Sequence, residues 1–455
     1  MGLMGIEGLA ERLAEGVVVG DPGVVASYSR DQTFVVPGEA LGVVLARSTE
    51  DVAVTLAWAD ENRVPVVPRG AGTGLAGGAT ATDGSVVLSL ARMNAIRELN
   101  TADQYAVVEP GVINADLDRA ARAHGLMYAP DPSSHEISTL GGNLATNAGG
   151  LRCVKYGVTR ESVLGLEVVL AGGKVINTGG RTVKGVTGYD LTGLFVGSEG
   201  TLGVITGATL RLRPAPSAEP VTVAGTFPSM VAAGEAVAAV VAAGIEPSLL
   251  ELVDRATLLA IDDWKNIGVE DDTAAMLIGQ VDVAEPREPA ARMAALFEAA
   301  GATAVAVSED RAESDELLGI RRMAYHASER LGHCLVEDVC VPRSKVPEMI
   351  ARIEKAASGH DVTVLTVAHA GDGNLHPLFV FDRGESEVPA PVWAAADEIF
   401  QGALDLGGTL TGEHGVGVLK RRWLGLELGD DRLAVQHAIK AALDPNGILN
   451  PGKAI

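Results

Sequence analysis

Hydrophobic and polar positions follow different patterns in the two halves of the chain. Up to about residue 213, short β-rich runs are separated by long glycine-rich segments with few charges, a pattern that predicts strands joined by extended loops. Beyond Pro214-Ala-Pro216, β-rich runs alternate regularly with stretches of helical period. The change of pattern at this proline-rich segment predicts a domain boundary.

The first half is expected to contain a few helices and a series of short strands. Ser48-Thr-Glu-Asp51 resembles a capping box, in which side chains satisfy backbone N–H groups at the start of a helix. Helices are predicted over residues 3–15, 48–62 and 114–124, and strands over 42–46, 64–67, 85–90, 105–109 and 208–213, with a strand–turn–strand unit over 161–175.

The second half predicts a ferredoxin-like layer, because two βαβ patterns follow one another. The strands of this layer are predicted over residues 221–227, 249–253, 274–282 and 303–307, the helices over 229–243 and 285–300, with an extra helix near 256–262. Beyond the layer, helices are predicted over residues 312–331, 346–357, 391–406 and 432–443, and a strand over 334–341.

A predicted hairpin over residues 362–382 carries the first indication of chemistry. Two β-rich runs flank Asp372-Gly373, and Asp-Gly between apolar runs favours a two-residue type I′ turn. With this pair at the turn centre, cross-strand partners have numbers that sum to 745, so His369 lies opposite His376. Opposed residues have Cβ atoms about 4.5–5.5 Å apart, which suits a shared divalent metal. The alternative is a pair of solvated histidines on an edge strand.

Length and charge limit the class of protein. The chain has 455 residues, of which 47% are hydrophobic, so a folded protein of two or three domains is expected. The 36 basic and 59 acidic residues give a net charge of −23, which argues against binding to nucleic acid or to an anionic membrane surface. The most apolar window, residues 230–245, contains Glu235 and predicts a buried helix rather than a membrane span.

The cysteines and the N-terminal sequence bear on the compartment. Cys153, Cys334 and Cys340 form no Cys-x-x-Cys pair, so neither an iron–sulfur cluster nor a disulfide framework is indicated. The N-terminal stretch lacks a basic start followed by an apolar run, so no signal peptide is expected. A reducing, cytoplasmic location is therefore expected.

Residues 68–78 form a glycine-rich loop without an acidic side chain. Small residues let successive backbone N–H groups converge on a phosphate. Gly72, Gly74 and Gly77 also satisfy the GxGxxG pattern, but a dinucleotide-binding fingerprint must open a helix, whereas a turn and a strand follow here. A Rossmann fold is therefore rejected. The loop is interpreted as a phosphate cradle, and the alternative is an ordinary flexible turn.

Two further segments, residues 130–156 and 188–206, are rich in small neutral residues that form hydrogen bonds. A surface linker of this length is normally charged. Backbone groups and short side chains suit a loop that lies against a flat, polar ligand. Residues 130–156 are therefore interpreted as a ligand-binding loop, and residues 188–206 share their glycine-rich, nearly uncharged composition.

The motifs together establish a resemblance to a known family. PRGAGTGLAGGA, STLGGNLATNAGG, KYGVTRESVLGLEVVL and VGSEGTLGVIT resemble the FAD-binding domain of the vanillyl-alcohol-oxidase-like (PCMH-type) flavoproteins. HAGDGNLHP, TGEHGVG and DPNGILNPGK resemble the C-terminal half of the branch that contains glycolate oxidase FAD subunits, D-lactate dehydrogenases and D-2-hydroxyglutarate dehydrogenases. The likeness covers residues 38–453 in the order of the family.

The resemblance implies an α+β fold, with a PCMH-type FAD-binding domain and a ferredoxin-like FAD-linked oxidase C-terminal domain. It implies an FAD-binding domain over residues 1–215, a substrate- and metal-binding domain over 216–412, and a C-terminal segment over 413–455 that returns to the flavin site. The flavin is expected between the N-terminal domain and the metal-bearing face of the second domain.

The residues that the resemblance assigns to FAD lie in the glycine-rich motifs and the C-terminal tail. They are Pro68, Arg69, Gly70, Ala71, Gly72, Thr73, Ser138, Thr139, Gly142, Asn143, Thr146, Gly149, Gly150, Glu199, Gly200, Thr201, Val204, Ile205 and Asn450. The flavin is expected to be non-covalent. His135 is the candidate for covalent attachment, but a histidine in a glycine-rich loop is more often exposed to solvent.

Oxidation of a 2-hydroxy acid needs a base that accepts the hydroxyl proton and a flavin N5 that accepts the α-hydride. Because the base should titrate near neutral pH, histidine is the favoured residue type. The resemblance implies His414 as the base and Arg321 as the arginine that binds the substrate carboxylate, with Arg322 as the alternative if the register differs by one. The alternative is that these residues have only structural roles, with Glu413-His414 capping a loop and Arg321 exposed on a helix surface.

The resemblance also implies a divalent metal, either Zn, Mn or Fe, held by His369, His376 and Glu413. Two imidazoles and one carboxylate leave a position open for substrate, as expected of a catalytic metal site. The metal is expected to hold the substrate and to lower the pKa of the substrate hydroxyl.

Two departures from the hydroxyglutarate branch bear on the substrate. That branch has a lysine two residues before the Asp of its DVxxP segment and an asparagine two residues after the second histidine. These positions are Val336 and Leu378 here. Both changes favour a small acid of the D-lactate or glycolate type over a dicarboxylic acid.

The sequence thus predicts FAD-dependent oxidation of a small 2-hydroxy acid to the 2-oxo acid. Two alternatives stay open: a flavin-dependent transferase resembling alkyl-glycerone-phosphate synthase, and the FAD subunit of a multi-chain glycolate oxidase. Because no iron–sulfur motif is present, electrons are expected to pass to an external acceptor or to a partner subunit. A homodimer is one assembly that the sequence allows.

Overall fold

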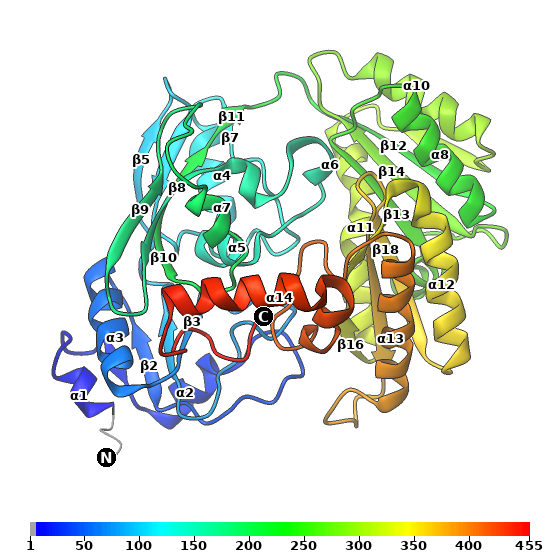
Figure 1. The fold of residues 1–455 in the computed structure, drawn as a ribbon. Helices are drawn as coiled ribbons and strands as arrows, with labels where there is room; N and C mark the ends of the chain where they lie inside the picture. The colour runs from blue at the N-terminus through cyan, green and yellow to red at the C-terminus, as the bar shows by residue number, and fades with distance from the viewer. Residues whose placement is uncertain (1–5) are drawn as a thin grey trace. The chain divides into compact units, whose positions relative to one another are not determined.

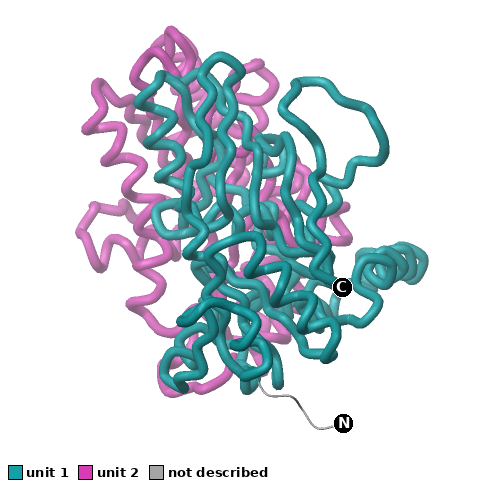
Figure 2. The backbone as a smooth tube through the Cα atoms, turned by 90° about the vertical axis from the view of Figure 1, so that its left-hand side faces the viewer, with its two compact units in different colours: residues 1–150, 157–215, 413–455 teal, residues 151–156, 216–412 magenta. Residues whose placement is uncertain are grey.

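The chain forms two compact units in the computed structural model, which describes residues 6–455. Unit 1 comprises residues 1–150, 157–215 and 413–455, and unit 2 comprises residues 151–156 and 216–412 (Figure 2). A chain of this length cannot bury its apolar residues efficiently in one core. Accordingly, each unit has hydrophobic clusters of its own.

Unit 1 contains a four-stranded sheet in the order β1-β2-β4-β3. Its strands are β1 (Val18–Val19), β2 (Gly42–Leu45), β3 (Val66–Arg69) and β4 (Val86–Ser89). β2 and β3 both run parallel to β4, and every residue of β2 and β4 is buried. Continuous apolar runs are typical of such parallel strands, which are covered on both faces.

Unit 1 also contains a five-stranded antiparallel sheet in the order β5-β6-β10-β8-β9. Its strands are β5 (Ile96–Asn100), β6 (Tyr105–Val108), β8 (Val163–Val169), β9 (Val175–Gly179) and β10 (Val204–Arg211), and a short pair is formed by β7 (Leu126–Met127) and β11 (Arg213–Pro214). Helices α4, α5 and α7 pack against one face of this sheet (Figure 1).

The helices of unit 1 are mostly short. They are α1 (Glu7–Ala10), α2 (Pro22–Tyr28), α3 (Thr49–Asn62), α4 (Asn114–Arg122), α5 (Leu140–Thr146), α7 (Leu191–Phe195) and α14 (Leu424–Leu443). The predicted cap of α3 is confirmed, because the Ser48 side chain accepts a hydrogen bond from the N–H of Asp51. The helix predicted over residues 3–15 is wrong in length, and residues 3–5 lie outside the described part.

The rejection of a Rossmann fold is confirmed. β3 ends at Arg69, and the fully described segment up to β4 at Val86 is loop and turn. The interpretation of residues 130–156 as a loop is only partly correct, because they contain α5 and α6 (Cys153–Tyr156), and residues 188–206 contain α7. The side chains of Thr139 and Asp190 cap α5 and α7. Glycine lowers helix propensity, but buried leucines on these turns stabilise them by packing.

Unit 2 is built on a sheet of strands in the order β15-β12-β14-β13-β18-β19-β16, with β17 also paired to β19. The strands are β12 (Val221–Phe227), β13 (Leu249–Asp254), β14 (Ala275–Val281), β15 (Ala304–Val307), β16 (His333–Val336), β17 (Val339–Cys340), β18 (Thr363–His369) and β19 (Asn374–Phe381). The first four have the antiparallel strand order of the predicted ferredoxin-like layer.

The helices of unit 2 cover both faces of this sheet. They are α8 (Met230–Ala242), α9 (Arg255–Lys265), α10 (Arg287–Ala299), α11 (Arg311–Leu331), α12 (Val346–Gly359) and α13 (Ala390–Asp405). α9 and α11 pack on one face, over Val253, Val367 and Leu378. α8, α10 and α12 pack on the other face (Figure 1). The single strand predicted over residues 334–341 is wrong, because Glu337 and Asp338 separate β16 from β17.

The predicted register of the histidine hairpin is also wrong. His369 pairs with Asn374, and His376 pairs with Val367, so cross-strand partners sum to 743 rather than 745. The loop has four residues, 370–373, and only Gly373 among them has a positive φ, of 91°. A type I′ turn would require two residues with positive φ. The two histidines are therefore diagonal neighbours, and they still share one face because side chains alternate along a strand.

Candidate active site

Three segments that the resemblance assigns to FAD lie together in unit 1. A Cβ atom added at Gly70 would lie 2.2 Å from the Thr139 hydroxyl oxygen, and one added at Gly200 would lie 2.9 Å from the Pro68 ring. The three glycine-rich loops therefore approach one another at distances that only glycine permits. Loops of small residues that approach so closely fit a phosphate-bearing cofactor, because small side chains give it access to backbone N–H groups.

The C-terminal tail closes this cluster. The Asn450 side-chain amide donates to the carbonyl oxygens of Gly78 and Glu199, at 3.0 and 2.7 Å. The buried ammonium group of Lys453 donates to the carbonyl oxygens of Thr80 and Gly78, at 2.6 and 3.3 Å, and burial lowers the pKa of Lys453 to about 8. The last residues of the chain thus fix the glycine-rich loop that follows β3.

Glu199 holds a different loop. Its carboxylate accepts hydrogen bonds from the backbone N–H groups of Val416 and Gly417, both at 2.8 Å. The side chain is 8% exposed, and this burial raises its pKa. Glu199 and Asn450 both have positive φ, of 51° and 41°, a conformation that non-glycine residues adopt mainly where surrounding structure requires it. Glu199 thereby fixes the backbone that carries Glu413 and His414.

The side chains of other predicted FAD residues contact the rest of the chain. Val204 and Ile205 lie in β10, and their side chains are buried in the hydrophobic clusters. The Arg69 guanidinium donates to the carbonyl oxygen of Arg30 at 2.6 Å, and burial lowers the pKa of this arginine. Local side-chain hydrogen bonds are formed by Ser138, Thr139, Asn143, Thr146 and Thr201. Of the remaining positions, Gly142 lies in α5, and loops and turns contain Ala71, Gly72, Thr73 and Gly150.

His369 and His376 lie side by side on the inner strands of the unit 2 sheet. Their ring centroids are 5.0 Å apart with planes at 83°, and the residues are 3% and 5% exposed. β18 and β19 both have neighbours on either side. The alternative of solvated edge-strand histidines is therefore excluded.

Glu413 completes a group of possible metal ligands. One ligand atom from each of His369, His376 and Glu413 lies within 4.8 Å of the others. Glu413 directly follows Gly412, the last residue of unit 2. Within unit 1, a Cβ atom added at Gly149 would meet the Glu413 carboxylate, so these two residues approach each other closely. Two imidazole nitrogens and one carboxylate oxygen form a donor set that fits a divalent transition metal.

Asp338 fixes the backbone on both sides of the possible metal ligands, at the histidine hairpin and just before Glu413. Its buried carboxylate accepts hydrogen bonds from the Thr411 hydroxyl, from the Gly412 N–H at 2.9 Å, and from the Asn374 side-chain amide. The hairpin and the segment that leads to Glu413 are therefore held by the same side chain. The DVxxP segment, singled out in the sequence only for its neighbouring position, supplies this anchor.

Arg321 is buried and paired rather than exposed on a helix surface. It lies on α11 with 9% exposure, and its Nε–H donates to Glu251 Oε2 at 2.8 Å. The adjacent Arg322 is exposed. The same carboxylate also contacts His369, whose Nδ1 lies 2.8 and 2.9 Å from the two carboxylate oxygens. Sequence reasoning missed Glu251, although a lone carboxylate in the apolar strand LLELV is a recognisable feature.

The other histidines of interest differ in their surroundings. His414 is only slightly exposed, and its Nε2 lies 4.0 Å from the Glu413 carboxylate. His135 is more exposed, at 41% of its side chain, and its Nδ1 lies 3.1 Å from the carbonyl oxygen of Pro132. His414 therefore lies beside a predicted metal ligand, whereas His135 belongs to a solvent-facing turn.

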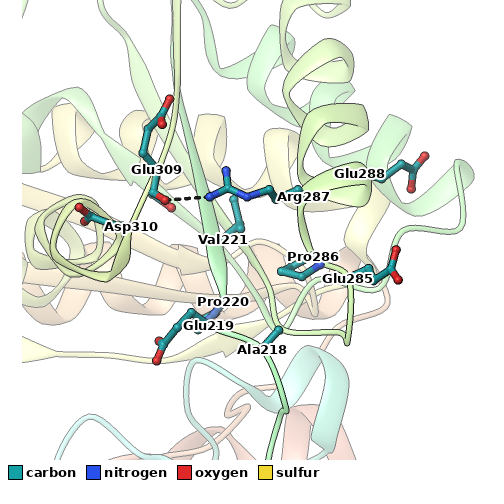
Figure 3. A pocket seen from close by; sticks show the side chains of 11 residues that line it. Ala218, Glu219, Pro220, Val221, Glu285, Pro286, Arg287, Glu288, Glu309 and Asp310 are labelled. Carbon is teal, nitrogen blue, oxygen red and sulfur yellow. Dashed lines mark hydrogen bonds between the residues drawn. The ribbon is translucent and has the colours of Figure 1, made fainter.

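A cavity of about 550 Å³ at the edge of unit 2 does not contain any of these residues. Figure 3 shows Arg287 at its centre, with a hydrogen bond of 3.0 Å to the carbonyl oxygen of Glu309. The carboxylates that surround it belong to Glu219, Glu285, Glu288, Glu309 and Asp310. This excess of negative charge does not suit an anionic substrate.

The chain matches two known domain families. Residues 40–179 match the family described as FAD binding domain, and residues 216–454 match the family described as FAD linked oxidases, C-terminal domain. The second match alone covers more than half of the chain.

Similar proteins of known name extend over nearly the whole chain. A glycolate oxidase subunit GlcD from Bacillus subtilis is 44% identical over 431 residues, which cover 94% of this chain and 91% of that protein. A D-lactate dehydrogenase from Archaeoglobus fulgidus is 36% identical and covers 98% of both chains.

Solved structures show the fold. A p-cresol methylhydroxylase with bound substrate has a TM-score of 0.81 at 18% identity, covering 99% of this chain and 96% of the other. An alkyldihydroxyacetonephosphate synthase has a TM-score of 0.73 at 16% identity, covering 98% and 84%. In the described part of the chain, no helix is both long and apolar enough to cross a membrane.

Proposed function

The chain belongs to the FAD-linked oxidases that join an FAD-binding domain to an FAD-linked oxidase C-terminal domain, and from this premise we propose that it oxidises a small 2-hydroxy acid to the 2-oxo acid. The observation that carries the proposal is the group of His369, His376 and Glu413, which offers a metal site in a chain that also has an FAD-binding domain. Its similarity to glycolate oxidase subunits and D-lactate dehydrogenases supports the reaction class.

FAD would be held by the converging glycine-rich loops of unit 1, and a divalent metal by His369, His376 and Glu413. When bound, the flavin supplies a hydride acceptor and the metal supplies a Lewis acid for the substrate oxygens. The roles of the chain itself are binding, orientation and proton transfer.

His414 accepts the substrate hydroxyl proton in this proposal. A neutral imidazole is suited to this task near neutral pH. The loop around His414 is fixed at Val416 and Gly417 by Glu199, so the base has little freedom to move away. Such a preorganised base contributes typically 10²–10⁴-fold to the rate.

Arg321 binds the substrate carboxylate in this proposal. Its Nε–H is occupied by Glu251. A planar guanidinium has four further N–H groups, and the fork formed by its two outer nitrogens suits a carboxylate. Binding at this end of the substrate orients the Cα–H bond for hydride transfer.

The substrate is expected to be small. Val336 and Leu378, which replace the polar residues of the hydroxyglutarate branch, lie directly opposite each other on β16 and β19. Leu378 shares one face of β19 with His376 and packs in a hydrophobic cluster. A second carboxylate placed there would lose its hydration without a partner. Glycolate or D-lactate therefore suits this surface better than a dicarboxylic acid.

The electron acceptor is expected to be an external molecule or a partner subunit. The Bacillus subtilis relative is named as a subunit, which supports assembly with other chains. In that case the isolated chain would reduce its flavin with substrate but transfer electrons slowly until a partner or an artificial dye is added.

The test is an anaerobic visible-spectrum titration of the purified protein with a panel of D- and L-2-hydroxy acids. Bleaching of the flavin band by glycolate or D-lactate is expected. A flavin that no 2-hydroxy acid bleaches would contradict the proposal and favour a net non-redox, transferase-type reaction. The His414→Ala variant is expected to keep its yellow flavin but to lose rapid bleaching, and rapid bleaching in that variant would remove His414 as the base.

A further inference from the structure

Glu251 lies at the centre of the most unusual buried contact in unit 2. Its side chain is fully buried, and its carboxylate lies between an imidazole and a guanidinium. The register of β13 and β18 explains why Glu251 lies beside His369. The residue numbers of paired positions, such as Leu252 and Ala368, sum to 620, and so do those of Glu251 and His369. The two residues are thus opposed on neighbouring strands, on the face covered by α9 and α11.

This contact determines which nitrogen of His369 is protonated. An ionised carboxylate can only accept hydrogen bonds. His369 Nδ1 lies 2.8 and 2.9 Å from the two oxygens of Glu251 and must therefore carry the proton. Nε2 is then the ring nitrogen whose lone pair can coordinate a metal, and the ring is held in one orientation. A carboxylate behind a histidine ligand also raises the basicity of that ligand.

We propose that Glu251 is a positioning residue that orients both His369 for the metal and Arg321 for the substrate carboxylate. The inference rests on the proposed function, since it assumes that His369 binds a divalent metal. It assigns a role to a residue outside the ligand group. One carboxylate then couples the metal site to the substrate-binding arginine, because each partner loses its anchor when Glu251 is changed.

Packing stability alone does not account for this arrangement. Replacement of a buried ion pair by apolar residues of similar volume is often neutral or stabilising. The surroundings of Glu251 on this face are apolar, with Val253 and Val367 in the adjacent hydrophobic cluster. A charge retained at such a position fits a requirement for orientation.

Asp254, three residues further along β13, is a matched control. Its carboxylate is also buried, but it accepts hydrogen bonds from the backbone N–H groups of Thr257 and Thr366, at 2.8 and 2.9 Å. It caps the start of α9 and contacts neither His369 nor Arg321 in any hydrogen bond found among the described residues. Substitution of Asp254 perturbs the same strand without touching the histidine.

The experiment measures Zn²⁺ and Mn²⁺ affinity directly, without turnover. The full-length holoprotein is stripped of metal with EDTA, and each ion alone is titrated back in competition with a chromophoric chelator. Glu251→Gln is expected to weaken affinity about 10–100-fold, the usual effect of losing such a partner of a histidine ligand. Glu251→Asp keeps the charge and is expected to lie between Glu251→Gln and the unchanged protein. Asp254→Asn is expected to bind metal as the unchanged protein does.

Each outcome decides the question. Unchanged affinity in both Glu251 variants would overturn the inference while leaving the proposed function intact. Equal weakening in Asp254→Asn would show that loss of stability, not orientation, is responsible, and would also overturn it. If Glu251→Gln does not fold, Glu251→Asp decides by the same criterion. If the unchanged protein binds neither ion, the metal part of the proposed function fails and this inference fails with it.

Discussion

Two buried glutamates, one in each unit, are held by different kinds of donor. Glu199 in unit 1 accepts hydrogen bonds from the backbone N–H groups of Val416 and Gly417. Glu251 in unit 2 accepts them from the side chains of Arg321 and His369. A carboxylate bound to the backbone fixes the path of a loop. A carboxylate bound to side chains fixes the orientation of those side chains, here the two that are proposed to bind substrate and metal.

The two kinds of donor also differ in how they compensate a buried charge. Backbone N–H groups are dipoles without net charge, and burial raises the pKa of Glu199. Asp254, which also accepts from two backbone N–H groups, has its pKa raised to about 6 by burial. Glu251 has a guanidinium at 2.8 Å, which carries a full opposite charge. Removal of charge from a carboxylate should therefore affect these sites very differently.

The largest effect is expected at Glu251. In the metal-free protein, Glu251→Gln leaves the Arg321 guanidinium buried without its counter-charge, which typically costs about 3–5 kcal/mol. Urea unfolding followed by circular dichroism in the presence of EDTA measures this loss. Metal is excluded because ligand binding would add stability of its own.

The double variant Glu251→Gln, Arg321→Met is the control for this prediction. It is expected to lose less free energy of unfolding than the sum of the two single variants, because neither charge is then left alone. Strict additivity, or a cost below about 1 kcal/mol for Glu251→Gln, would contradict the pairing and remove the contrast between the two glutamates.

The histidine hairpin shows what local sequence can and cannot determine. The Asp372-Gly373 pair suggests a two-residue turn, but Gly373 accepts a hydrogen bond from Val341 and Asn374 donates to Asp338. These contacts come from distant residues and select a longer loop. The shared face of the histidines was nevertheless predictable, because a change of two in the register sum keeps side-chain parity.

Glu251 and Asp338 show why part of the site escaped prediction. Glu251 contacts residues 70 and 118 positions away in the chain. Asp338 contacts Thr411 and Gly412, more than 70 positions away. A carboxylate in an apolar strand indicates that a partner exists, but the identity of that partner depends on strand order. The family motifs indicated His369, His376 and Glu413, whose possible ligand atoms lie within 4.8 Å of one another, because each motif is a short local pattern.

The second prediction concerns Asp254 and tests whether burial raises its pKa even though two backbone N–H groups donate to its carboxylate. Because the folded-state pKa of about 6 exceeds the ordinary value of 3.8, the folded state binds the proton more tightly. Ionisation therefore costs stability as the pH rises through this window. By linkage the cost is about 3 kcal/mol, fully present above pH 6 and absent below about pH 3.8.

Asp254→Asn removes this dependence. The difference in unfolding free energy between the unchanged protein and the variant should shift by about 3 kcal/mol between pH 3.5 and 6.5, with the unchanged protein losing stability as the pH rises. Urea midpoints at several pH values measure it. Parallel curves for the two proteins would mean that the carboxylate ionises as it does in water.

The smallest effect is expected for Glu199→Gln. The amide oxygen still accepts a hydrogen bond from one of the two N–H groups of the loop. The other N–H group loses its acceptor, which lowers the free energy of unfolding by about 1–2 kcal/mol. That cost is partly offset, because burial destabilises a charged carboxylate, as the raised pKa of Glu199 indicates, but destabilises a neutral amide less. The loop at Val416 and Gly417 is therefore expected to keep its path, and flavin bleaching by substrate is expected to slow less than tenfold.

Glu199→Ala is the informative comparison for this last prediction. It leaves both N–H groups without their acceptor, so the loop that carries Glu413 and His414 loses its anchor. A displacement of about 1 Å at a catalytic group can cost 100-fold in rate, and bleaching should slow accordingly while the histidine pair of unit 2 is unchanged. If Glu199→Gln proved as damaging as Glu199→Ala, then the charge of Glu199 rather than its acceptor oxygens would matter. The two glutamates would then act alike, and the distinction between loop-fixing and side-chain-orienting carboxylates would not hold.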